Sequence, residues 1–359
     1  MSAEIERREG GSVYKGKLPE GCVLCAQGAK MVLLVTGKCS SSCFYCPLSE
    51  HKRGRDVVYA DEMPVEKDDD IIYEGKMIDA LGTGITGGDP LVVFNRTLHY
   101  IDLLKEKFGE KHHIHLYTAS GNMEAYKILA EHGLDEIRIH PPPEVWGKIE
   151  NTIYGKRIMW AVKTDMDVGV EVPAIPGYEE GLIHLIRFSS EAGVKFVNLN
   201  ELEFSETNAE EMLKRGFDVK SDVSSAAKSS EELAVKIVKN VDVPITVHYC
   251  SSSFKDAVQM KNRIKRRAKN VAKDYEVITE EGTLILGVIY ADDITLAYKK
   301  IKEEFEIPEN LIAINYDRNR VEMAPWILEE IAEEIEYDAY EVEEYPTYDR
   351  LQVESLKLN

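Results

Sequence analysis

Short apolar runs alternate with longer amphipathic stretches between residues 30 and 205. The apolar runs have the length of buried strands. They lie at Met31–Val35, Gly84–Thr86, His113–Tyr117, Glu136–His140, Val168–Pro173 and Lys195–Asn200. The amphipathic stretches between them have helical spacing and lie at Asp69–Leu81, Thr97–Phe108, Met123–His132, Glu150–Lys163 and Tyr178–Ala192. Strand–helix alternation predicts a parallel sheet with helices outside, so we expect an α/β fold built on a partial (β/α)6 barrel.

The pattern changes after a further strand at Ile245–Val247. Later segments predict a small α+β domain, in a ferredoxin-like arrangement. Its elements are a strand at Gly282–Tyr290, a helix at Asp293–Phe305, a strand at Leu311–Tyr316 and a helix at Pro325–Ile335. The acidic, tyrosine-rich segment Tyr337–Tyr348 is expected to be loosely ordered. We therefore expect three parts: an N-terminal arm at 1–29, the barrel with its last strand at 30–250, and a basic helix plus the α+β domain at 251–359.

Composition narrows the class of protein. A chain of 359 residues has room for one large and one smaller domain. It has no apolar run as long as a membrane span, and its N-terminus lacks the apolar core of a signal peptide. We therefore expect a cytoplasmic protein with no membrane contact, whose cysteines are thiols or metal ligands rather than disulfides. The formal net charge of −20 argues against broad, nonspecific binding of nucleic acid.

Three cysteines directly after the first apolar run carry the main chemical signal. Cys39, Cys43 and Cys46 have the spacing C-x3-C-x2-C. Three thiolates on one loop can hold three irons of a cubane [4Fe–4S] cluster and leave the fourth iron open to a small molecule. A structural zinc site is the alternative, but it usually needs four ligands. Chance spacing of unrelated buried cysteines is the other.

The residue before the third cysteine is aromatic, and Tyr45 could stack on a purine. With this aromatic, the cysteine spacing resembles the signature of the radical S-adenosylmethionine (radical SAM) superfamily. The resemblance implies that Cys39, Cys43 and Cys46 are cluster ligands and that Tyr45 lies on the adenine side of SAM. It also implies the reaction: SAM chelates the open iron, and the reduced cluster cleaves it to methionine and a 5′-deoxyadenosyl radical. That radical then abstracts hydrogen from a substrate.

A glycine turn follows the second expected strand. Gly87, Gly88 and Asp89 resemble the GGE motif of the superfamily, with aspartate in place of the commonest glutamate. The resemblance implies that backbone carbonyls of this turn receive the SAM ammonium group. An ordinary Gly-Gly turn is the alternative.

Two weaker matches follow the third and fifth strands. The hydroxyls of Thr118 and Ser120 could bond the SAM ribose or carboxylate, although helix capping would equally explain Ser120 and its neighbour Asn122. Ile175 and Gly177 match the GxIxGxxE motif, which the superfamily places near adenine. Pro173 replaces the first glycine of that motif, and Glu180 matches its last position.

The other three cysteines form a second candidate site. Cys22 and Cys25 make a CxxC knuckle before the first strand, and His248 and Cys250 end a later one. Together they could supply four ligands for zinc or for an auxiliary Fe–S cluster. Such a metal would pin the N-terminal arm to the strand that carries Cys250. Buried cysteines that share no site are the alternative.

Basic residues crowd the segment from Lys255 to Lys273, where Asp256 is the single acid. Such a helix could bind RNA phosphates or an acidic protein. It could also face the acidic run between Glu329 and Asp338, or remain solvated.

The sequence as a whole is interpreted as a cytoplasmic radical SAM enzyme with a C-terminal substrate or partner domain. The turn Ile175–Gly177 especially resembles pyruvate formate-lyase activating enzymes and their relatives, which implies a protein substrate and an electron donor such as ferredoxin or flavodoxin. The resemblance covers about Lys30 to Ser205. An RNA-modifying radical SAM enzyme is one alternative, and a noncatalytic Fe–S electron carrier is another. We expect no cobalamin domain, because fewer than 30 residues precede the barrel.

Overall fold

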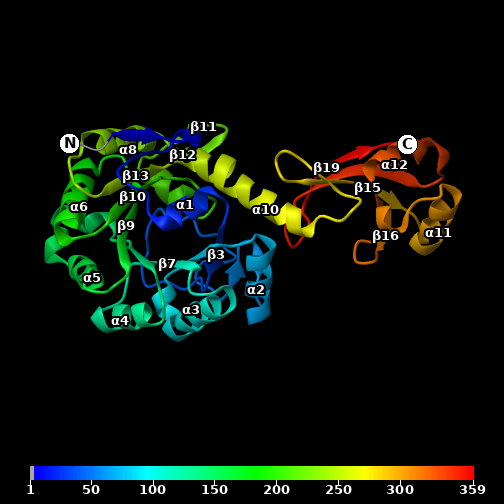
Figure 1. Cartoon of the computed structure of the whole chain (residues 1–359). Helices are drawn as coiled ribbons and strands as arrows, with labels where there is room; N and C mark the ends of the chain where they lie inside the picture. The colour runs from blue at the N-terminus through cyan, green and yellow to red at the C-terminus, as the bar shows by residue number, and fades with distance from the viewer. Residues whose placement is uncertain (1–3) are drawn as a thin grey trace. The chain divides into compact units, whose positions relative to one another are not determined.

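The computed structural model describes residues 4–359. Contacts divide these residues into two compact units. The first comprises the chain up to Lys76 together with Ala80–Met260, and the second comprises Met77–Asp79 together with Lys261–Asn359. Figure 1 labels many of the helices and strands of both units.

A single large sheet forms the core of the first unit. Within the described residues its strand order is β1-β2-β13-β10-β9-β8-β7-β6-β3-β4-β5. The seven central strands are parallel and carry the buried apolar core. They are β3 Lys30–Leu34, β6 Gly82–Thr86, β7 His113–Thr118, β8 Glu136–Ile139, β9 Asp167–Ala174, β10 Phe196–Glu201 and β13 Thr246–Cys250. All six expected barrel strands are present, and the strand expected at Ile245–Val247 joins them in parallel.

Short antiparallel strands extend both ends of this row. They are β1 Ile5–Arg7 and β2 Val13–Lys15 at one end, and β4 Tyr59–Ala60 and β5 Met63–Pro64 at the other.

Helices lie in the connections between the parallel strands, as expected (Figure 1). They are α2 Asp68–Met77, α3 Phe94–Phe108, α4 Met123–Glu131, α5 Ile153–Ala161, α6 Glu179–Ala192 and α8 Ser230–Asn240. The expected start of one helix at Glu150 is wrong. A 3-10 helix occupies Pro143–Asn151, and the Thr152 hydroxyl caps α5 by accepting from Gly155 N at 3.3 Å.

An unexpected insert lies between β10 and α8. It contains α7 Ala209–Lys214 and the hairpin of β11 Val219–Ser221 with β12 Ser224–Ala227.

The N-terminal arm is part of the first unit. β2 pairs antiparallel with β13, placing Tyr14 opposite His248. Next comes α1, Glu20–Ala26, which carries Cys22 and Cys25, so the expected CxxC knuckle is one turn of helix instead of a loop. A Cβ at Gly21 would lie 2.7 Å from both Arg138 Nη2 and His115 Nδ1. The helix therefore packs directly against the inward side chains of β7 and β8.

The second unit has the expected α+β fold. Its order is β15 Leu284–Tyr290, α11 Ile294–Glu304, β16 Ile312–Asn315, β17 Arg320–Met323, α12 Pro325–Ile331, β18 Asp338–Glu344 and β19 Gln352–Lys357. The strands lie in the order β16-β17-β15-β18-β19 and are antiparallel, and the short β14, Val277–Ile278, also pairs with β15. The first four strands and two helices make the β-α-β-β-α-β arrangement of a ferredoxin-like fold.

The expectation of loose order at Tyr337–Tyr348 is wrong. Strand β18 pairs with β15 along its whole length, from Asp338 to Glu344. Ala339 and Val342 of this strand are buried in the core. Glu344 is also buried, and its charge is met by Arg320 Nη2 at 2.7 Å. Pairing with a buried arginine explains how so acidic a segment can be a strand.

The basic segment is helical but not uniform. It comprises α9 Ser252–Phe254, a π-helix at Lys255–Met260 and α10 Lys261–Val271. Several of its cations bind protein groups: Lys255 binds Glu203 at 3.1 Å, Lys273 binds Glu322 at 2.9 Å, and Arg267 Nε donates to Pro346 O at 2.6 Å. These contacts favour an intramolecular role for the basic residues, and RNA contact stays a prediction.

Among residues 4–359, no helix is long and apolar enough to cross a bilayer.

The packing of β9 against β10 generates a stability prediction. A Cβ at Gly169 would overlap the ring of Phe196, which is buried and has the Arg138 guanidinium 5.2 Å from its centroid. Gly169→Ala should therefore destabilise the protein by about 1–3 kcal/mol, because the ring has no room to move away. Gly147→Ala is the matched control, since no atom lies within 4 Å of its added Cβ. Urea unfolding followed by circular dichroism should separate the two variants, and equal midpoints would contradict this account of the packing.

Candidate functional site

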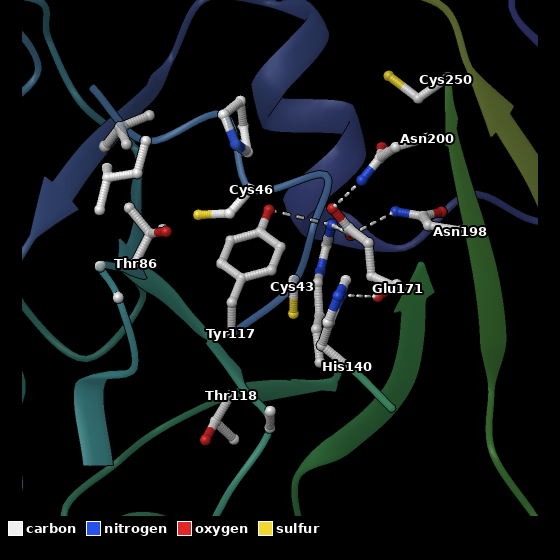
Figure 2. Close-up of a pocket in the computed structure, with 18 of the residues that line it drawn as sticks. Cys43, Cys46, Thr86, Tyr117, Thr118, His140, Glu171, Asn198, Asn200 and Cys250 are labelled. Carbon is white, nitrogen blue, oxygen red and sulfur yellow. Dashed lines mark hydrogen bonds and ion pairs between the residues drawn. The ribbon is translucent and has the colours of Figure 1, made fainter. Parts of the chain in front are cut away.

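A cavity of about 710 Å³ lies at the carboxyl ends of the parallel strands and reaches into the barrel. Figure 2 shows Cys43 and Cys46 of the loop after β3 together with His140, which follows β8, Glu171 of β9, and Asn198 and Asn200 of β10. Its lining includes all six cysteines, Cys22, Cys25, Cys39, Cys43, Cys46 and Cys250. The sequence-predicted residues Tyr45, Gly87, Gly88, Thr118 and His248 also line it.

The loop that carries Cys39, Cys43 and Cys46 begins where β3 ends. Cys39 is exposed, whereas Cys43 and Cys46 are half-buried. Burial raises the pKa of the Cys39 and Cys43 thiols, so binding iron must release their protons. Three soft thiolate donors on one cavity wall fit an Fe–S cluster. In the part of the chain that the structure describes, however, no three His, Cys, Asp or Glu side chains already stand in metal-ligand geometry.

Backbone contacts hold the cysteine loop against the glycine turn after β6. Gly88 N donates to Thr36 O at 2.8 Å, and Asp89 N donates to Lys38 O at 2.8 Å. A Cβ at Gly88 would overlap Lys38 O. Glycine is therefore required at this position, because any side chain would separate the two loops.

Asp89 supports the turn from behind instead of facing the cavity. It is 1% exposed and is not part of the cavity lining. Its carboxylate accepts from the Thr118 hydroxyl at 2.8 Å, from Ala119 N at 3.1 Å and from Leu91 N at 3.0 Å. These bonds tie the glycine turn to the end of β7 and give Asp89 a positioning role. Direct contact of Asp89 with SAM stays a prediction.

Three other predicted SAM contacts lie outside the cavity lining. Ser120 does not line the cavity; its N–H donates to Thr118 Oγ1 at 2.9 Å. Ile175 is fully buried, and Gly177 forms a turn with φ of 89°. Their contacts with SAM stay predictions. Asn122 does cap α4, accepting from Ala125 N at 2.9 Å, as the alternative account proposed.

Tyr45 is fixed by a chain of hydrogen bonds. Its hydroxyl lies 2.8 Å from His140 Nε2, and His140 Nδ1 lies 2.7 Å from the Glu171 carbonyl. Because a carbonyl only accepts, Nδ1 donates and Nε2 accepts from Tyr45. Burial lowers the pKa of His140, which agrees with this neutral ring. From the insert, Asn208 Nδ2 donates to Tyr45 O at 3.0 Å, so the insert also secures the cysteine loop.

A buried polar wall that the sequence analysis missed faces the cysteine loop (Figure 2). Arg138 Nη1 pairs with Glu171 Oε2 at 2.6 Å. Asn198 Nδ2 and Asn200 Nδ2 each donate to the same carboxylate at 2.9 Å. Burial acts to raise the pKa of Glu171, but Arg138 and the two amides outweigh it and lower the pKa to about 2. The carboxylate is therefore ionised at neutral pH.

His248 lines the cavity, and one of its ring nitrogens has no partner among the described residues. Its Nδ1 lies 3.0 Å from Asn198 Oδ1, while Nε2 is buried and has no hydrogen-bond partner among the described residues. The Asn198 amide nitrogen already donates to Glu171, so Oδ1 is the acceptor and His248 Nδ1 the donor. Burial, with a smaller effect of Arg8, lowers the pKa of His248 to about 3. The ring is therefore neutral, and Nε2 is a free acceptor.

The second cysteine set is gathered at the same cavity. Cys22 Sγ accepts from Asn198 Nδ2 at 3.3 Å. Burial raises the pKa of Cys250 to about 12, and the nearby Cys25 and Cys22 add to the effect. The structure thus brings the three thiols and His248 onto one cavity, without arranging any three as metal ligands.

Solved structures give weak likenesses. SuiB of Streptococcus suis bound to S-adenosylmethionine is 11% identical with a TM-score of 0.42, over 62% of this chain and 50% of that one. The FeFe-hydrogenase maturase HydG from Carboxydothermus hydrogenoformans is 14% identical with a TM-score of 0.40, over 62% and 58%. Methylornithine synthase (PylB) is 15% identical with a TM-score of 0.41, over 58% and 62%. The chain thus spans only half to about three fifths of these structures, and TM-scores below 0.5 are too low to support a fold or a function.

Sequence families and a close relative are more informative. Residues 33–175 match the family described as the radical SAM superfamily, and residues 282–358 match a domain of unknown function, DUF8061. A protein of Methanocaldococcus jannaschii named "Putative glycyl-radical enzyme activating enzyme MJ0021" is 44% identical over 361 residues. The match covers 95% of this chain and 93% of that protein. With the cysteine loop and the glycine turn joined at one cavity, this identity shows that the chain is an enzyme that belongs to the radical SAM superfamily.

Proposed function

We propose that the protein activates a glycyl-radical enzyme by abstracting hydrogen from a glycine of that protein. The observation that carries the proposal is the pair of backbone hydrogen bonds that joins the cysteine loop to the glycine turn. These bonds hold together one cavity wall, which is lined by Cys39, Cys43, Cys46, Gly87 and Gly88. The relative in M. jannaschii bears the name of such an activating enzyme.

Each group on this wall has a defined task in the proposal. Cys39, Cys43 and Cys46 hold the [4Fe–4S] cluster, which supplies the electron that cleaves bound SAM. The carbonyls of Gly87 and Gly88 receive the SAM ammonium group, and Asp89 keeps the turn in place. Tyr45, held by His140, bounds the adenine side. In the substrate step a glycine C–H bond breaks homolytically, and the hydrogen atom passes to the 5′-deoxyadenosyl radical to give 5′-deoxyadenosine.

The polar wall opposite the cysteine loop provides an argument for a peptide substrate. A peptide in the barrel brings N–H groups that must be satisfied when water is excluded. His248 Nε2 is a buried acceptor without a partner among the described residues, and it lines the cavity. Asn200 and Glu171 lie on the neighbouring strands of the same wall. A neutral histidine acceptor suits a substrate N–H, and it stays neutral across the physiological range because its pKa is near 3.

We also propose that Cys22, Cys25 and Cys250 bind a second metal, with His248 as a candidate fourth ligand. Cys22 and Cys25 are three residues apart on α1, so their side chains share one helix face. Cys250 ends β13 and interacts electrostatically with both. Zinc or an auxiliary Fe–S cluster would suit such thiolate donors. His248 Nε2 would serve either as this ligand or as the acceptor for substrate.

The first prediction concerns the cluster. The variant Cys39→Ala/Cys43→Ala/Cys46→Ala should lose the iron and sulfide of a [4Fe–4S] centre after anaerobic reconstitution, and it should form no 5′-deoxyadenosine. The reason is that no other thiols lie on this loop. Ser40→Ala/Ser42→Ala, in the same loop, should keep both properties. Retained SAM cleavage in the cysteine variant would contradict the assignment of the loop.

A second prediction concerns the source of the abstracted hydrogen. Extract proteins from the native cell, labelled with α-deuterated glycine, should transfer deuterium into 5′-deoxyadenosine when incubated with the reduced enzyme and SAM. Mass spectrometry measures the transfer. RNA labelled with deuterated nucleosides should transfer none. Deuterium from the RNA instead of the protein would replace the proposed function with RNA modification.

A third prediction concerns the second metal. The Cys39→Ala/Cys43→Ala/Cys46→Ala variant should still bind zinc or iron, because the other thiol set is intact. Adding Cys250→Ala should remove that metal, whereas adding Ser253→Ala, on the adjoining turn, should not. Elemental analysis after reconstitution gives the readout. Neither zinc nor iron above background in the starting variant would rule out the second site.

A further inference from the structure

A cluster of cations on an otherwise acidic protein lies beside the cysteine loop. We call residues His51–Arg55 the basic loop; within it Lys52, Arg53 and Arg55 are cations, although the chain carries a net charge of −20. Arg53 and Arg55 are exposed, and Arg53 also lines the cavity, whereas Arg55 does not. A free positive surface of this kind attracts acidic macromolecules, and the surrounding negative charge confines that attraction to the loop.

The basic loop is bonded directly to the backbone that leads to the cysteines. Gly37 N donates to Arg55 O at 2.8 Å, and Gly54 N donates to Gly37 O at 2.8 Å. A Cβ at Gly37 would overlap Lys52 O, so the two backbones are in contact. Cys39 follows two residues after Gly37 and is exposed. The shortest bonded path from the basic loop to Cys39 is therefore one backbone hydrogen bond to Gly37 and then two residues along the chain. A protein bound at the basic loop would lie at one end of this path.

Neighbouring acids do not cancel the positive charge. Asp56 is neutralised by Lys38 at 3.2 Å and by Arg96 at 2.6 Å. Lys52 places its ammonium 4.3 Å from the centroid of the Tyr59 ring. Glu62 acts on Lys52, and Glu50 is exposed before the loop. Five cations, Lys38, Lys52, Arg53, Arg55 and Arg96, therefore stand against the carboxylates of Glu50, Asp56 and Glu62.

We propose that the basic loop docks an acidic protein that carries one electron at a time, of the ferredoxin or flavodoxin kind. The proposal rests on the proposed function, because each SAM cleavage consumes one electron. A cluster held by Cys39, Cys43 and Cys46 would pass the carrier's electron into the sulfonium of SAM. The S–C5′ bond breaks, methionine leaves with a neutral thioether, and the odd electron remains on the 5′-deoxyadenosyl carbon. Charge complementarity orients the carrier and speeds its encounter with the exposed side of the cysteine loop.

The test compares two sources of electrons in the reconstituted enzyme, without protein substrate. An acidic [4Fe–4S] ferredoxin, kept reduced, is one source, and dithionite is the other. Arg55→Glu, at the arginine that does not line the cavity, should slow ferredoxin-driven formation of 5′-deoxyadenosine at least threefold and should leave the dithionite-driven rate within twofold. Lys127→Glu makes the same change of charge at an exposed position on α4 and should affect neither rate. In the unmodified enzyme, added salt should slow only the ferredoxin-driven reaction.

The outcomes separate the alternatives. An unchanged ferredoxin-driven rate in the arginine variant, or a salt-independent rate in the unmodified enzyme, would overturn the proposal. Equal loss with both electron sources would assign the loop to SAM or cluster binding and would also overturn it. If dithionite drives no SAM cleavage even in the unmodified enzyme, the proposed function fails, and the docking proposal fails with it.

Discussion

The interior of the first unit is organised by one buried guanidinium, that of Arg138. Burying a charge is costly unless it is paired, and this cation is met by Glu136 at 2.5 Å and by Glu171 at 2.6 Å. Its Nη2 also lies 3.6 Å from Cys22 Sγ. One side chain thus links β8, β9 and the N-terminal helix α1.

The consequences extend along the cavity wall. Because Arg138 keeps Glu171 ionised, the amides of Asn198 and Asn200 are drawn to that carboxylate. Asn198 is then oriented so that its carbonyl accepts from His248, which leaves His248 Nε2 free. The ionised state of Glu171 and the tautomer of His248 therefore follow from a single ion pair, whereas burial keeps His248 neutral.

The parts that the sequence could predict are those whose signal is local. Apolar runs such as Met31–Val35 mark buried strands, and the spacing of Cys39, Cys43 and Cys46 identifies the loop chemistry without any tertiary information. The two strands and two helices predicted after Gly282 likewise indicate the α+β class of the second unit, although β17, Arg320–Met323, was not predicted. In each case residues close together in the sequence form the pattern and also determine the structure or the chemistry that it indicates.

The polar wall was missed because its meaning depends on long-range pairing. Arg138, Glu171 and Asn198 lie on three separate strands, and each would be read as a surface residue on its own. A signal did exist: Arg138 with His140, and Asn198 with Asn200, recur at alternate positions near strand ends, where parallel strands point polar groups into one cavity. The prediction of loose order around Asp338–Glu344 failed for a similar reason. The acidic composition of this strand gave no sign that one glutamate is buried and neutralised by Arg320.

The two walls of the cavity are built by different means, and this separates their chemistry. The wall with Cys39, Cys43, Cys46, Gly87 and Gly88 is fixed by backbone hydrogen bonds and by glycines that admit no side chain. The wall opposite consists of side chains on regular strands and on α1, joined by charge. Side chains on strands can be exchanged without moving the backbone, whereas the loop wall tolerates little change. Such a division leaves Asn200 and His248 freer to vary than the loops of the opposite wall, whereas Arg138 and Glu171 are held by their ion pair.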